Sequence, residues 1–174
     1  MSETPTAMSI STYLESDYAE FSQLASELYH HQFPHSLDYP LDHDEISKHR
    51  QQLLQIHKEK GVMLTLRADQ KLRGFVCVQG PIEPGKATDP GDVSYVFLSD
   101  LFVENTYRNR GFGSALLHAA EDWAQQLGCH KIALKVMSEN DAAMRFYQKN
   151  RFISRFTIMD RAIDSVKTPV KQML

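Results

Sequence analysis

Residues 94–123 read SYVFLSDLFVENTYRNRGFGSALLHAAEDW, and this stretch decides the fold. Its first part, residues 95–103, is almost entirely apolar, with Ser99 and Asp100 as the polar exceptions. Such a run is typical of a β-strand that is covered on both faces. After a short loop, small and apolar residues recur at helical spacing over residues 115–123. The stretch therefore predicts a buried strand, a loop and an amphipathic helix, in that order.

The loop between the predicted strand and helix has the features of an anion site. Gly111 and Gly113 carry no side chains, so backbone N–H groups there can approach a ligand closely. The same N–H groups open a helix, where they have no intrahelical partner and the helix dipole adds partial positive charge. Arg108 and Arg110 add full charges. The arrangement suits a phosphate or pyrophosphate; the alternative is a tight strand-to-helix turn with solvated arginines.

The glycine pattern of this loop is similar to that of one known family. Arg108-x-x-Gly111-x-Gly113 resembles the acetyl-CoA signature of the GNAT N-acetyltransferase superfamily, (Gln/Arg)-x-x-Gly-x-(Gly/Ala). The loop is not a Walker phosphate loop, because no Gly-Lys-Ser/Thr follows it. It is not a Rossmann fingerprint either, because the third glycine is missing.

A second stretch, from Asn140 to Phe152, resembles the other GNAT signature, Asn-x-x-Ala-x-x-(Phe)-Tyr-x-(Lys)-x-Gly-Phe. It predicts a short helix with apolar residues on one side. One position departs from the family pattern, because the glycine before Phe152 is Arg151 here. A glycine at that place usually ends the helix in the left-handed conformation. We expect Asn150, which tolerates this conformation, to take its place.

The rest of the chain predicts the order of elements that GNAT proteins share. Strands are predicted at 8–14, 62–67, 72–79, 95–103, 131–137 and 152–162, and helices from a cap at Asp17 to Pro34, at 45–60, from Gly111 to Gly128 and after Asn140. The resemblance implies an α/β (α+β) fold with a mixed, mostly antiparallel central sheet, splayed between strands 4 and 5 and flanked by about four helices. A single domain is expected over 1–174, with 1–7 as a loose leader and 163–174 as a tail or a last strand.

The segment around the second predicted helix contains several titratable residues. The inner face of helix 45–60 comprises Ile46, His49, Leu53 and Ile56. In the loop 30–44, His31 and His35 stand four apart, but Pro34 argues against the helix that would bring them onto one metal. The acidic residues here are Asp38, Asp42, Asp44 and Glu45. They would attract an amine acceptor, or Asp42 or Asp44 would cap the helix.

Composition narrows the class of protein. The chain has 174 residues and 42% hydrophobic content, which suits one globular domain. A net charge of −3 argues against general nucleic-acid binding, which requires a basic surface. No apolar run reaches the roughly 18 residues of a membrane helix, and residues 1–10 lack the layout of a signal peptide. Cys77 and Cys129 are too few for a disulfide framework or a metal cluster. We expect a cytoplasmic protein without a metal.

The GNAT resemblance implies acetyl-CoA as the co-substrate. The pyrophosphate would lie on backbone N–H groups of 110–114, and the pantetheine arm would add to the edge of the central strand at 101–103. Asn140 matches a family residue that contacts this arm, although an ordinary helix cap is the alternative. The implied cofactor-binding residues are Leu101, Phe102, Val103, Arg108, Asn109, Arg110, Gly111, Phe112, Gly113, Ser114, Asn140 and Tyr147.

The same resemblance implies the catalytic groups. Tyr147 matches the tyrosine that protonates the sulfur of CoA as it leaves, and a phenol is a suitable acid for a thiolate. The sequence identifies the general base, which must take a proton from the amine, less clearly than the acid. In polyamine-acetylating relatives a glutamate of the central strand takes this role, but Ser99 stands at that position here. Asp100, Glu104 or a chain of waters would then remove the proton, and Asp100 would otherwise be structural.

These observations predict an N-acetyltransferase. It would move an acetyl group from acetyl-CoA to a primary amine of a small molecule or of a peptide or protein, by direct attack in a ternary complex. The alternative is a non-catalytic GNAT domain that binds acyl-CoA as a sensor or regulator. The absent glutamate disfavours a polyamine acceptor, and pairing of two copies into a homodimer is possible within the family.

Overall fold

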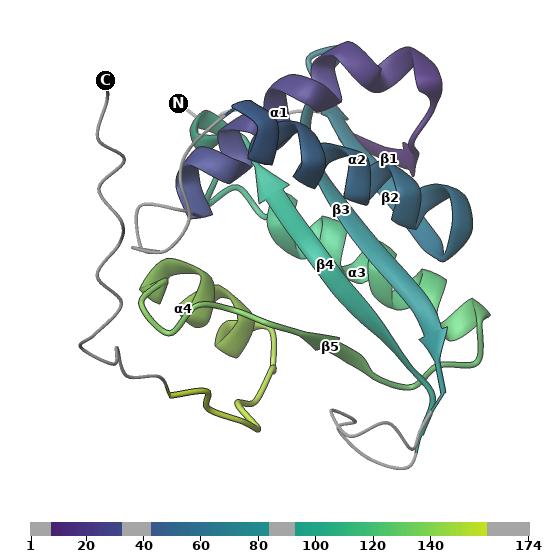
Figure 1. The fold of residues 1–174 in the computed structure, drawn as a ribbon, viewed down its shortest axis with the longest axis vertical. Coiled ribbons are helices and arrows are strands. Elements are labelled where there is room, and N and C mark those ends of the chain that lie inside the picture. The colour runs from purple at the N-terminus through teal and green to yellow at the C-terminus, as the bar shows by residue number, and fades with distance from the viewer. Residues whose placement is uncertain (1–7, 33–42, 84–92, 160–174) are drawn as a thin grey trace, which may run out of the picture.

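A five-stranded sheet organises the computed structural model, which describes residues 8–32, 43–83 and 93–159 (Figure 1). The strands are β1 (Met8–Thr12), β2 (Gly61–Ala68), β3 (Lys71–Ile82), β4 (Tyr95–Val103) and β5 (Ile132–Leu134). They lie side by side in sequence order. The first four are antiparallel, and β5 runs parallel to β4. The sheet is therefore mixed and mostly antiparallel, as the sequence predicted.

Helices cover both faces of this sheet. α1 (Tyr18–Gln32) and α2 (His43–Glu59) pack on one face, α3 (Phe112–Gln126) lies on the other, and α4 (Asp141–Lys149) follows β5 (Figure 1). Two short 3-10 helices, η1 (Glu15–Asp17) and η3 (Asn105–Tyr107), connect elements. Each face has its own buried cluster: Leu116, Leu117 and Val96 belong to the α3 side, and Phe21, Leu53 and Phe75 to the α1–α2 side.

A β-bulge interrupts β4 in its middle. Leu98 pairs with Val78 and Asp100 pairs with Cys77, so Ser99 has no partner in β3. The extra residue changes which side chains face which side of the sheet. Leu98 belongs to the cluster on the α3 side, whereas Asp100 faces α2, where it meets His49. Without the bulge, regular alternation would direct Asp100 to the same side as Leu98.

β4 and β5 part at the same point. Their parallel pairing covers only Val96, Phe97 and Leu98 of β4, opposite residues 132–134. β4 then continues through 99–103 without a strand beside it on that side, among the described residues. This confirms the predicted splay. It also explains why the predicted strand 131–137 is too long. The backbone groups of a strand need a partner, and after Leu134 the chain of β5 has none because β4 has turned away.

The predicted last strand, 152–162, is wrong over the residues described. Residues 152–159 form no strand, and 160–162 lie outside the described residues. Ile153, Phe156 and Ile158 are 72%, 76% and 84% exposed. β5 offers only a three-residue neighbour for pairing. Also outside the described residues are the leader 1–7, the tail 163–174, His35, Asp38 and Asp42. A loop was expected at 80–92, but 80–82 belong to β3, and 84–92 lie outside the described residues.

Two predicted helix caps are corrected. Asp17 does not cap α1: it ends η1, accepts a hydrogen bond from the Leu14 N–H at 3.0 Å and pairs with Arg67 at 2.6 Å. Asp44 lies inside the first turn of α2, where its charge suits the helix dipole, and so it is not the cap.

The end of α4 also differs from the prediction. Arg151, and not Asn150, takes the left-handed conformation, with φ of +66°. The Arg151 N–H donates to Gln148 O and the Phe152 N–H to Tyr147 O, both at 3.0 Å, which is the Schellman arrangement. The hydrophobic contact typical of this motif is present, because the Phe152 and Tyr147 rings lie 5.4 Å apart. The helix end therefore fixes the place of Tyr147.

Replacing Arg151 by glycine should stabilise the protein, because a left-handed arginine carries a steric cost of about 1 kcal/mol that glycine avoids. We expect Arg151→Gly to raise the free energy of unfolding by about that amount in urea titrations. The matched control is Asn150→Gly, one residue earlier, at φ of −91°. It should lower stability, because it also removes the bond from Asn150 Nδ2 to Phe146 O. Loss of stability in Arg151→Gly would contradict this account of the helix end.

Candidate active site

The loop before α3 is built as an open helix N-terminus. Gly111 caps the helix in the left-handed region, with φ of +85°. The first bond of the helix runs from the Ala115 N–H to Gly111 O at 2.9 Å, so the N–H groups of 112–114 have no partner inside the helix. A Cβ placed on Gly111 would meet no atom within 4 Å. Asn109, two residues earlier, is also left-handed. This turn therefore leaves three backbone N–H donors without a partner inside the helix.

Aromatic and charged side chains hold this loop in place. The Tyr107 ring stacks on Phe112, with centroids 5.7 Å apart, and the guanidinium groups of Arg73 and Arg110 lie 4.4 and 5.4 Å from its centre. The Tyr107 hydroxyl donates to the Asp69 carboxylate at 2.6 Å. These contacts connect the loop to the β2–β3 hairpin, and the hairpin thereby holds the N-terminus of α3 in place.

Arg108 joins the loop to the end of β4. Its Nε donates to Val103 O at 2.9 Å, and its guanidinium carbon lies 5.4 Å from the centre of the Phe102 ring. Arg110 is also exposed. Phe102 and Val103 are themselves buried, whereas Leu101 is half-buried. The predicted pantetheine edge and the predicted pyrophosphate loop are therefore directly linked.

Gly113 is the point where the two signature segments meet. A Cβ there would lie 3.1 Å from Cε2 of Phe146 in α4 and 3.9 Å from Cδ2 of Leu101 in β4. The glycine therefore lets α4 approach the start of α3. Because Tyr147 follows Phe146, this contact brings the tyrosine of the second signature to the region of the first.

Tyr147 is half-buried among aromatic rings. The Phe146 and Phe152 rings lie 5.2 and 5.4 Å from its own, both edge-on. Burial raises the pKa of the Tyr147 hydroxyl, and the charge of Asp100 raises it further. The phenol is therefore protonated at neutral pH and can act as a proton donor.

Asp100 forms a buried pair with a residue that the sequence analysis did not single out as functional. His49 Nε2 of α2 lies 3.5 Å from Asp100 Oδ2, and the two side chains are 23% and 5% exposed. Burial lowers the pKa of His49, but the contact with Asp100 outweighs it, so that the pKa lies above its ordinary value. The feature of the sequence that could have pointed to His49 is its position, because it is a titratable side chain on the otherwise apolar inner face of a predicted helix.

Two other predicted residues have structural partners. Glu104, one of the alternative bases, uses both carboxylate oxygens: Oε2 accepts from Arg73 at 2.7 Å and Oε1 from Thr106 at 3.0 Å. It belongs to the support of the loop. Asn140 caps α4, because its side-chain oxygen accepts from the Ala143 N–H at 3.0 Å. This confirms the cap, and a contact with a cofactor stays a prediction.

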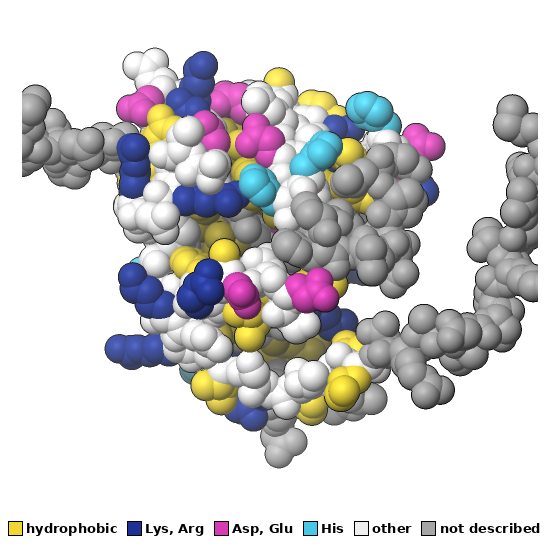
Figure 2. All heavy atoms as spheres, turned by 90° about the vertical axis from the view of Figure 1, so that its left-hand side faces the viewer, with side chains coloured by type: hydrophobic (Ala, Val, Ile, Leu, Met, Phe, Trp, Pro, Cys, Tyr) yellow, Lys and Arg dark blue, Asp and Glu magenta, His cyan; other side chains and the backbone are white. Residues whose placement is uncertain are grey.

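Figure 2 looks onto the side where α4 and the end of α1 lie, and Lys and Arg side chains gather on one half of it, with His side chains toward the other. Within the described ranges there is no group of three His, Cys, Asp or Glu residues that could hold a metal. Nor is any helix there long and apolar enough to cross a membrane.

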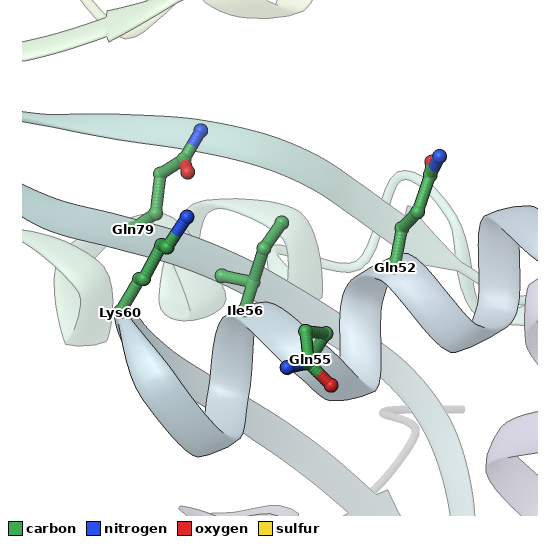
Figure 3. A pocket seen from close by; sticks show the side chains of 5 residues that line it. All are labelled: Gln52, Gln55, Ile56, Lys60 and Gln79. Carbon is green, nitrogen blue, oxygen red and sulfur yellow. The ribbon is translucent and has the colours of Figure 1, made fainter.

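A separate surface pocket lies between the end of α2 and β3. It is lined by Gln52, Gln55, Ile56, Lys60 and Gln79, and none of these residues was predicted as a site residue (Figure 3). Gln52 stands one helical turn after His49 along α2. Because α2 and α3 cover opposite faces of the sheet, the pocket is separate from the α3 loop.

Comparison with known proteins identifies the family. The model of the acetyltransferase (GNAT) family matches residues 18–152. Streptothricin acetyltransferase A of Bacillus subtilis (strain 168) is 37% identical over 59 residues, which are 34% of this chain and 34% of that protein. An uncharacterised N-acetyltransferase of Yersinia pestis is 37% identical over 59 residues, 34% of this chain and 42% of that protein. The matches thus span less than half the length of these curated relatives.

Solved structures share the fold at low sequence identity. The BH1408 protein of Bacillus halodurans, as a tetramutant, superposes with a TM-score of 0.78 at 19% identity, covering 89% of this chain and 99% of that one. The aminoglycoside N-acetyltransferase AAC(6')-Iy in complex with CoA gives a TM-score of 0.70 at 19% identity, covering 95% and 100%. Another structure of AAC(6')-Iy, with a bisubstrate analogue, gives 0.68 at 21%, covering 91% and 99%.

Introducing a negative charge at Gly111 should abolish binding of an anionic ligand at the loop. Two unit charges roughly 5 Å apart repel by about 3 kcal/mol at an effective dielectric constant of about 20, which is about 10²-fold in affinity. We expect Gly111→Asp to weaken acetyl-CoA binding by at least that factor in calorimetric titrations.

Gly111→Asn is the matched control, because asparagine has the same shape, tolerates the left-handed conformation and is neutral. It should retain affinity within about tenfold. Equal losses in the two variants would mean that shape, and not charge, is responsible. An unchanged affinity in Gly111→Asp would remove the anion site from this loop.

Proposed function

Because the chain belongs to the acetyltransferase (GNAT) family, we propose that it transfers an acetyl group from acetyl-CoA to a primary amine. The observation that carries the proposal is the contact at Gly113. There the open N-terminus of α3, the splayed part of β4 and the helix that bears Tyr147 come together. An anion-binding loop, a strand edge and a protonated phenol are the three things that this reaction needs.

In this proposal acetyl-CoA lies across the loop and along β4. Its pyrophosphate accepts hydrogen bonds from the N–H groups of 111–114, with Arg108 and Arg110 supplying charge. Its pantetheine arm follows 101–103 as an added strand, which the parting of β4 from β5 after Leu98 makes room for. A backbone N–H of the same stretch polarises the thioester carbonyl and stabilises the oxyanion.

The transfer proceeds by direct attack in a ternary complex. The amine nitrogen forms a bond to the thioester carbon, the carbonyl oxygen takes the negative charge, and the carbon–sulfur bond then breaks. Tyr147 donates its hydroxyl proton to the departing sulfur. Burial and the charge of Asp100 raise its pKa, so the phenol is protonated at neutral pH but is a weaker acid than a free tyrosine. Asp100 acts on the amine side of the same reaction.

For the acceptor we propose a small polar molecule with amino groups. The names of the relatives favour this class: one is a streptothricin acetyltransferase, and a structural neighbour was solved with a bisubstrate analogue of acetylneamine. A peptide or protein amine is the alternative acceptor, and an acyl-CoA sensor is the alternative function. A cytoplasmic location, a homodimer and a single domain over the whole chain stay predictions from the sequence.

Release of CoA measures the proposed activity directly. The protein is incubated with acetyl-CoA and either streptothricin or neamine, and the free thiol is followed with a chromogenic disulfide. Steady release that depends on the acceptor, with a mass gain of one acetyl group on it, is the expected result. Acetyl-CoA binding without acceptor-dependent release for these compounds or for peptide amines would favour the sensor.

Removing the hydroxyl of Tyr147 should slow turnover without weakening cofactor binding. A general acid contributes about 10²–10⁴-fold, so we expect Tyr147→Phe to lower kcat within that range while the Kd for acetyl-CoA changes little. Tyr13→Phe is the control, because the Tyr13 hydroxyl is also buried but has no hydrogen-bond partner among the described residues. It should leave kcat unchanged. Wild-type kcat in Tyr147→Phe would rule out the acid role.

A further inference from the structure

We propose that His49 of α2, oriented by Asp100, accepts the proton that the acceptor amine must lose before it attacks. This inference rests on the proposed function and adds a catalytic residue to it. The geometry behind it is the buried pair in which His49 Nε2 lies 3.5 Å from Asp100 Oδ2. The bulge at Ser99 creates this pair, because it turns Asp100 toward α2.

Exposure decides which member of the pair meets the amine. The Asp100 side chain is 5% exposed and the His49 side chain 23% exposed. A general base must come within hydrogen-bond reach of the proton that it removes. His49 is the more accessible side chain, but its Nε2 atom is buried and faces Asp100, so Nδ1 is the nitrogen that accepts the proton. Asp100 lies behind the imidazole and stabilises its protonated form. Asp100 is then a positioning residue for His49.

Among the described residues, Asp100 is the charged group whose contact raises the pKa of His49. Tyr29 of α1 has its ring 6.1 Å from that of His49. Cys77 of β3 pairs with Asp100 in the sheet, and burial raises the pKa of its thiol, so it is neutral. Tyr147 of α4, also neutral, interacts electrostatically with Asp100. On α2 itself, Glu45 and Lys48 pair with each other at 2.6 Å, and Arg50 donates to Ser22.

The protons balance with these residues. An ammonium group loses two protons as it becomes an amide, and CoA gains one. His49 accepts the first proton from the ammonium and passes it to solvent, which leaves the free amine to attack. The second proton leaves the nitrogen as the tetrahedral intermediate collapses and replaces the hydroxyl proton that Tyr147 gave to the sulfur. One proton per turnover is released overall.

The pair predicts a particular dependence of the rate on pH. His49 must be neutral to act as a base, so kcat/KM should fall as the pH drops through its pKa. Because the contact with Asp100 raises that pKa, the fall should occur above about 6.5, the value for an unperturbed histidine. Asp100→Asn removes this contact and leaves the effect of burial, which lowers the pKa. The acid limb should therefore move to lower pH in that variant.

The test uses His49→Gln, whose amide can still donate to Asp100 but cannot accept a proton at neutral pH. With neamine and streptothricin as acceptors, we expect kcat/KM to fall by about 10²–10⁴-fold and the acid limb to disappear, with the Kd for acetyl-CoA unchanged. His118→Asn, an exposed histidine of α3, is the control and should match the wild type. A loss under about threefold, with the acid limb retained, overturns the inference.

A second measurement separates this inference from the proposed function. If the wild type releases no CoA with either acceptor, the proposed substrates are wrong, and the pair is still open to test by ring-nitrogen NMR. The His49 signal is identified by its loss in His49→Gln. A His49 pKa above 6.5 that falls in Asp100→Asn supports the pair. The same pKa in both proteins overturns it.

Discussion

The structure depends on one local event, the bulge at Ser99 in β4. It ends the pairing with β5 after Leu98, and it reverses the direction of the side chains that follow. The first effect leaves a length of strand beside which another extended chain can lie. The second turns a carboxylate toward α2, on the face opposite α3. A continuous, regular β4 would supply neither feature, since a free strand edge is normally covered and a buried charge normally avoided.

Asp100 then organises the polar part of the interior. It faces His49 of α2 and also interacts with Tyr147, and its charge raises the pKa of both groups. The histidine becomes a stronger base, and the tyrosine stays protonated at neutral pH. Titratable groups with perturbed pKa values are typical of catalytic sites. The cost of burying the carboxylate is offset by its partner, which explains why His49 occupies an otherwise apolar helix face.

The sequence predicted the part of the chain whose signals are local. The apolar run 95–103 and the helical spacing after Gly111 correspond to β4 and α3. Contacts between residues far apart in the chain could not be predicted from the sequence. His49 was visible only as one polar residue on an inner helix face, because its partner stands 51 positions later in the chain, the difference between 100 and 49. Residues 152–159 were predicted as a strand but find no partner to pair with. Arg151 accepts a conformation that its type disfavours because the Schellman bonds require it.

The central claim is that the α3 N-terminus and the parted strands form a binding site for acetyl-CoA. Calorimetric titration of the purified protein with acetyl-CoA and with free CoA, at near-physiological salt, tests it most directly. One-to-one binding with a micromolar Kd for both ligands is the predicted result. Absence of binding by either ligand would mean that the loop around Gly111 is only a turn between a strand and a helix, and the account of the site would be contradicted.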